Sequence, residues 1–109
     1  MKATKRKKLE ANGWKVGNAA DILEMSDEEA AYIELKLKLA SQLKAARTRR
    51  RLTQTEFAKR IDSSQSRVAK METGDYSVSL DLLVKSLLAL GVTSEAIGKA
   101  IATSSSKAA

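Results

Sequence analysis

Apolar residues recur at the three- and four-residue spacing of helices along the chain from residue 26 onward. Ser26 with Glu29 and Thr53 with Glu56 each place a hydroxyl three residues before a carboxylate, a pairing that satisfies the free amides of a first helical turn. Gly74 stands where a helix is expected to end. The predicted helices run from 26 to about 50, 54 to 61, 65 to 73, 79 to 90, and from 93 or 94 to about 102, where Ile97 and Ile101 are predicted to point inward.

The long helix contains a stretch that alternates like a strand. Helix is nevertheless favoured, because Lys, Glu, Leu and Ala are good helix formers and the stretch has no Gly or Pro. On a helix the alternation becomes two apolar stripes, Ala30, Ile33, Leu37 and Ala40 on one face and Leu35, Leu39, Leu43 and Ala46 on another. The second stripe continues into the domain that follows. The first is expected to meet the N-terminal segment, a second subunit or another protein.

Composition divides the chain into three parts. Residues 1–40 hold a basic arm, a short turn between Gly13 and Gly17, a brief helix from Asn18 to Met25, and the start of the long helix. Residues 41–102 form a helical domain. Residues 103–109 are a small polar tail, expected to be flexible.

The charge balance favours an anionic partner, since 20 Lys and Arg face 13 Asp and Glu for a net charge of +7. The sequence has no Cys and no His, which argues against a disulfide framework, a metal site and the usual general base, and no cofactor is expected. No apolar run is long enough for a membrane span. The basic first eight residues are not followed by a signal-peptide apolar region, so the chain is predicted to be cytoplasmic and nucleoid-associated.

The positive charge concentrates between Leu43 and Thr73, where nine cations face three anions. This block coincides with two short helices joined by three or four residues. Such a pair can lay its second helix in the DNA major groove while the first crosses the backbone.

The residues of this block carry a resemblance to the Cro/repressor-type (XRE) helix-turn-helix family. It rests on Leu52-Thr53-Gln54, Glu56-Phe57-Ala58, Ile61 to Val68, Met71 to Gly74, Ser79 to Leu83 and Leu88 to Gly91. The resemblance covers about 43–101 and implies an all-α, five-helix domain, here preceded by an arm and a long connecting helix. It also implies a repressor that binds a palindromic operator in double-stranded DNA as a homodimer.

Carried over by position, the resemblance gives candidate DNA-binding residues. Gln54 matches a glutamine that contacts a phosphate, Gln65, Ser66 and Lys70 match positions that meet base edges, and Arg67 stands beside them. Gln65 has an amide that can pair with adenine at two points. Ser64, at the start of the recognition helix, completes the set, and Arg47 with Glu72 matches a structural ion pair. In the alternative reading these residues only start helices or stay solvated.

The chain departs from the family pattern at three positions. Asp62 stands where the turn usually has Gly, and Asp can adopt the left-handed conformation at modest cost. Asp75 stands in a loop that is basic in many relatives, which is expected to cost a phosphate contact. Val78 replaces the usual Pro.

The front third is similar to the leader of HigA-type antitoxins, with Gly13 to Gly17, Ala19-Ala20-Asp21 and Ser26 to Tyr32 carrying the likeness. This implies a partner, a small basic ribonuclease toxin facing the acidic stretch from Asp21 to Glu34. In the alternative reading Trp14, Ile22 and Leu23 simply pack on the first apolar stripe. The competing functions are a stand-alone phage-repressor-like regulator, an enzyme and an RNA binder. The enzyme is disfavoured because Asp27, Glu28 and Glu29 are explained by capping, and the RNA binder because aromatic residues are scarce.

Overall fold

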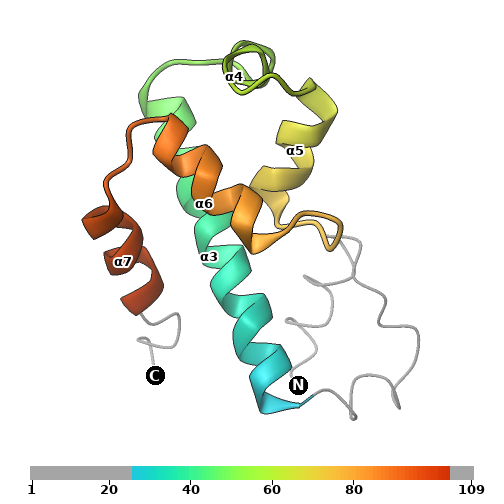
Figure 1. The fold of residues 1–109 in the computed structure, drawn as a ribbon, viewed down its shortest axis with the longest axis vertical. Helices are drawn as coiled ribbons and strands as arrows, with labels where there is room; N and C mark the ends of the chain where they lie inside the picture. Colours follow the sequence, from blue (N-terminus) through green and yellow to red (C-terminus); the bar gives the residue numbers. More distant parts are fainter. Residues whose placement is uncertain (1–25, 104–109) are drawn as a thin grey trace.

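The computed structural model describes residues 26–103, and within them every regular element is a helix (Figure 1). This confirms the all-α fold class. The predictions for the arm, for the turn and brief helix before residue 26, and for residues 104–109 of the tail lie outside the described residues. The helices are α3 (Asp27–Arg49), α4 (Gln54–Arg60), α5 (Gln65–Thr73), α6 (Leu80–Ala89) and α7 (Ser94–Ala102).

Both predicted capping boxes are present. The Ser26 hydroxyl accepts the Glu29 amide at 3.0 Å while the Glu29 carboxylate accepts the Ser26 amide at 2.8 Å. Thr53 and Glu56 make the same pair of bonds at the start of α4. The helix starts therefore lie where local side-chain chemistry places them.

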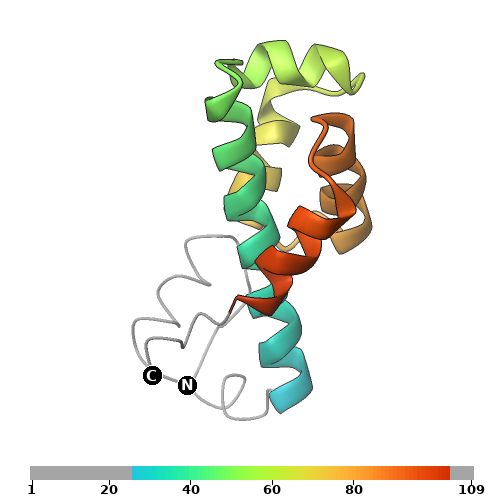
Figure 2. The same cartoon turned by 90° about the vertical axis from the view of Figure 1, so that its left-hand side faces the viewer.

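The core forms where α3 meets the shorter helices. Figures 1 and 2 show α3 as the longest rod, with α5, α6 and α7 packed along it and α4 across its C-terminal end. The second apolar stripe of α3 enters this core, as predicted, through Leu39, Leu43 and Ala46, all fully buried. The largest buried side chains from the other elements are Phe57, Val68, Met71, Val78, Leu83 and Leu87. The hydrophobic effect thus fixes α4 and α5 on a rigid support.

The first stripe of α3 has a partner that the sequence did not indicate. Ala40 belongs to the same core, and the Leu37 side chain lies beside Gly74 at the end of α5. A Cβ atom built on Gly74 would stand 2.7 Å from Leu37 Cδ2. The C-terminal half of this stripe is therefore covered by the chain's own helix-turn-helix unit.

The inward orientation predicted for Ile101 is wrong. Its side chain is 39 % exposed, whereas Ile97 one turn earlier is buried. The last turn of α7 meets a polar part of α3, where the Lys38 amino group donates to the Ile101 carbonyl oxygen at 3.4 Å. In that turn only the partly buried Ala100 still packs against the core.

Between residues 26 and 103, none of the helices combines the length and the apolar composition that a membrane crossing requires.

Candidate nucleic-acid interface

The turn between α4 and α5 is built on an aspartate. Asp62 adopts a positive φ of 57°, the left-handed conformation expected where the family pattern has Gly. The Ser63 amide returns to the Ala58 carbonyl at 2.8 Å, which closes the end of α4. The Ser64 hydroxyl then accepts the Arg67 amide at 3.2 Å and starts α5. Short-range bonds thus set the angle between the two helices.

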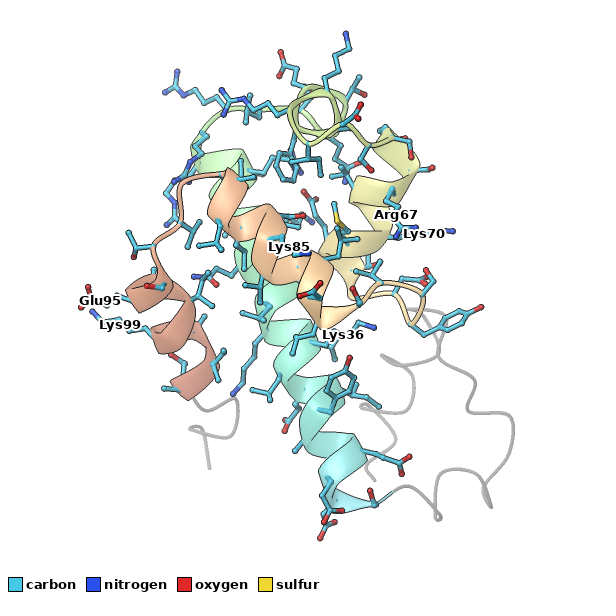
Figure 3. All side chains as sticks on the ribbon, in the orientation of Figure 1. Lys36, Arg67, Lys70, Lys85, Glu95 and Lys99 are labelled. Carbon is cyan, nitrogen blue, oxygen red and sulfur yellow. The ribbon has the colours of Figure 1, made fainter. Side chains whose placement is uncertain are left out.

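One face of α5 is held by the core and the other faces outward. Val68 and Met71 are fully buried, and Ser86 of α6 donates to the Met71 sulfur at 3.6 Å. The outward face carries the predicted site residues Ser64, Gln65, Ser66, Arg67 and Lys70, all of them exposed. Figure 3 shows Arg67 and Lys70 on the same side of α5, pointing away from α6. The helix therefore presents a row of polar and cationic side chains.

Four polar side chains connect the interior to this face. Arg47 of α3 forms a buried ion pair with Glu72 of α5, through Nε to one carboxylate oxygen and through Nη2 to the other at 3.1 Å. The same Glu72 Oε1 accepts the Gln54 amide at 3.1 Å. Gln54 Oε1 in turn accepts the Gln65 amide at 2.6 Å. The predicted Arg47–Glu72 pair is confirmed, and it is the inner end of a chain of hydrogen bonds that reaches the exposed start of α5.

The positive charge of the block lies mostly at the surface. Because Arg47 and Glu72 neutralise each other, eight cations remain against two anions between residues 43 and 73. All eight are exposed: Lys44, Arg49, Arg50, Arg51, Lys59, Arg60, Arg67 and Lys70. Of the two anions, Glu56 is engaged in its capping box. The hydrogen bond from the Thr53 backbone holds the pKa of Glu56 below its usual value, so it stays ionised.

The loop after α5 uses Asp75 for a structural purpose. Its carboxylate accepts the Ser77 amide at 2.9 Å and the Ser77 hydroxyl at 2.7 Å, a local turn that precedes the buried Val78. Partial burial works against ionisation, but the Ser77 bonds and the nearby charges of Lys70 and Lys36 hold the pKa of Asp75 below its usual value. The aspartate that departs from the resembled pattern is thus explained by the turn it makes.

Two features of the structure could not be predicted from the sequence. Gln54 and Gln65 are eleven residues apart on different helices, so no periodicity predicts their hydrogen bond. Lys36 lies on α3 among residues that alternate with Leu and reads as solvated, yet it is 2 % exposed. Its amino group donates to the Tyr76 carbonyl at 3.4 Å, and burial lowers its pKa.

Within residues 26–103 the arrangement consists of exposed hydrogen-bonding groups and cations. Over residues 26–103 no group of His, Cys, Asp or Glu side chains is placed to hold a metal ion. What it does offer is a positively charged surface from which a rigid helix projects amides, hydroxyls and cations.

Residues 43–97, half of the chain, match a protein family described as helix-turn-helix. Comparison with curated proteins and with solved structures gives no match. The family match begins within α3 and ends within α7, so it contains the turn, α4, α5 and the whole hydrogen-bonded chain from Arg47 to Gln65.

Proposed function

The chain belongs to the XRE-type helix-turn-helix family of DNA-binding regulators, which is not an enzyme family, and from this premise we propose that it is a repressor that binds a palindromic operator as a homodimer. The single observation that carries the proposal is the exposed polar face of α5, braced from below by Val68 and Met71. Two such helices about 34 Å apart would read the two half-sites of one operator.

On this proposal the site residues divide by role. Gln65 and Ser66, at the start of α5, contact base edges, and Arg67 and Lys70 contact guanine edges or phosphates. Gln54, in the first turn of α4, contacts a phosphate through the side-chain N–H that its bond to Glu72 leaves over. Ser64 keeps its oxygen on the Arg67 amide, so its hydroxyl proton is what it can offer to DNA.

The test is binding of the full chain to DNA from its own promoter across a range of salt concentrations. Affinity should fall steeply with salt, and Lys70→Ala should reduce the slope by about one. Lys85→Ala is the matched control, since Lys85 is an exposed lysine on α6, away from the α5 face (Figure 3). Equal effects of the two substitutions would contradict the assignment of the α5 face to DNA.

We further propose that the protein is a HigA-like antitoxin that represses its own operon. The supporting observation is the N-terminal part of α3, which lies outside the family match and extends past the other described helices (Figures 1 and 2). Its first turn carries exposed Asp27, Glu28 and Glu29, followed by Tyr32, which is 42 % exposed. This acidic end with an exposed aromatic residue suits a small basic ribonuclease.

Co-purification with the product of the adjacent gene tests the antitoxin proposal against a stand-alone phage-repressor-like regulator. Glu28→Lys and Tyr32→Ala should each weaken that complex. Asp81→Lys is the matched control, because Asp81 is also an exposed acid in the first turn of a helix. A neighbouring product that does not co-purify favours the stand-alone regulator.

A further inference from the structure

The hydrogen bonds between Glu72, Gln54 and Gln65 have a direction that a carboxylate imposes. Ionised Glu72 has only acceptor oxygens, so the Gln54 amide must turn its NH2 group toward it. The carbonyl oxygen of Gln54 then faces Gln65, whose NH2 group donates to it at 2.6 Å. The orientation of the exposed amide is thus set by a side chain that is almost completely buried.

Glu72 itself has no freedom to change this direction. Both of its oxygens are engaged by Arg47, and its side chain is 2 % exposed. Arg47 is in turn fixed by a bond from Nη1 to the Leu52 carbonyl at 2.6 Å. The side-chain amides of Gln54 and Gln65 therefore both donate inward, toward Glu72, and Gln65 receives the last constraint.

We propose that Glu72 is a positioning residue that sets which base Gln65 can read; this rests on the proposed function. With one N–H used by Gln54, the Gln65 amide offers its carbonyl oxygen and its second N–H. Adenine presents one donor, N6–H, and one acceptor, N7, in the major groove, and matches this pair. Guanine presents two acceptors, O6 and N7, and meets the Gln65 carbonyl with O6, which is repulsive.

Reversing the direction of the hydrogen bond between Gln54 and Glu72 should therefore reverse the preference of Gln65 for adenine over guanine. In Glu72→Gln, the carbonyl oxygen of the new amide is expected to face Arg47 Nε, so its NH2 group stands where Oε1 stood and the bond from Arg47 Nη2 is lost. Gln54 must then turn its carbonyl inward and its NH2 group outward, and Gln65 must turn its carbonyl toward Gln54. The Gln65 amide now presents NH2, which suits the acceptors of guanine.

The experiment is selection from a pool of DNA duplexes with randomised sequence, using the full-length wild type, Gln65→Ala and Glu72→Gln. The wild type should select a site with an adenine that Gln65→Ala no longer requires. Glu72→Gln should select guanine at that one position and leave the others unchanged. The change in the adenine-to-guanine affinity ratio should be roughly 5- to 150-fold, the range of one two-point contact. Glu56→Gln, the same substitution at an exposed acid of α4, should select the wild-type site.

The outcomes separate the two ideas. If the wild type selects a site but Glu72→Gln selects the same base, only the positioning role fails. If the wild type selects no sequence, or Gln65→Ala leaves its site unchanged, base reading by Gln65 fails and the positioning role falls with it. Should Glu72→Gln not fold, as judged by circular dichroism, Gln54→Leu keeps the Arg47–Glu72 pair and must lose the adenine-to-guanine discrimination; retention of it overturns the proposal.

Discussion

The end of the recognition helix is sensitive to a single methyl group. Gly74 has φ 71°, and a Cβ there would lie 2.7 Å from Leu37 Cδ2. Gly74→Ala therefore incurs about 1–2 kcal/mol for a left-handed alanine. It incurs about 0.5–1.5 kcal/mol more for turning the Leu37 side chain out of its rotamer, since a methyl at the end of that side chain can move away. The expected loss in unfolding free energy is roughly 2–3 kcal/mol, and each kcal/mol lowers Tm by about 4–8 °C in a domain of this size.

Two other glycines are controls in the same thermal unfolding experiment. Gly91 has φ 87°, but its nearest atom is Arg50 Nη2 at 3.8 Å, an ordinary contact. Gly91→Ala should thus show only the conformational cost of about 1–2 kcal/mol. Gly98 lies inside α7, and a Cβ there would have no described atom within 4 Å. Gly98→Ala should stabilise the protein by about 0.4–1 kcal/mol.

The steric part of the Gly74 effect is isolated by a double-mutant cycle with Leu37→Ala. In the Leu37→Ala background, Gly74→Ala should cost no more than Gly91→Ala does, because the opposing methyl is gone. A Gly74→Ala variant that already equals Gly91→Ala in the wild-type background would refute the steric reasoning. The reasoning would also be refuted if Gly74→Ala cost more in the Leu37→Ala background than in the wild type.

Three further changes test the buried ion pair, the buried lysine and the capping box of α4. Arg47→Met should destabilise the protein by about 3–5 kcal/mol in urea unfolding, because it leaves buried Glu72 without its partner. Lys36→Met should raise Tm at neutral pH, because burial lowers the Lys36 pKa and so disfavours its charged form in the folded state. For the same reason the stability of the wild type should rise as the pH increases toward 10.5, and the variant should lack that rise. The hydrogen bond from the Thr53 backbone lowers the Glu56 pKa. The contribution of ionised Glu56 to the free energy of unfolding is therefore present above pH 4.5 and is lost as the pH falls below that value. Glu56→Gln should reduce this acid-side loss in thermal unfolding; an unchanged pH profile would contradict the capping assignment.

Most features of the fold that the sequence predicted depend on interactions between residues close together in the chain. Each helix start is set by a hydroxyl that caps its own first turn, a bond that spans three residues, and the ends at Gly74 and Gly91 follow from φ values that glycine favours. Ile101 shows the limit, because the spacing that buries Ile97 cannot say where the neighbouring helix stops being apolar.

The site was predictable only in its outline. The exposure of the α5 face follows from the burial of Val68 and Met71, which stand at the three-residue spacing of a helix. The bonds from Glu72 through Gln54 to Gln65 join residues on two helices, and the burial of Lys36 depends on where the loop around Tyr76 passes. Contacts of this kind arise from tertiary packing, so neither composition nor spacing encodes them directly.

The polar interior has a consequence for how specificity and stability are coupled in this domain. The Glu72 carboxylate is held by Arg47 inside the fold and by Gln54 toward the surface, so one side chain takes part in both packing and presentation. A substitution there changes the free energy of unfolding and the orientation of the exposed amide together. Arg67 and Lys70 lie outside this chain of bonds, exposed on the far side of α5. On the proposed function, changes at those two positions alter affinity without altering stability, whereas a change in base preference through Glu72 is constrained by the ion pair that holds α3 against α5.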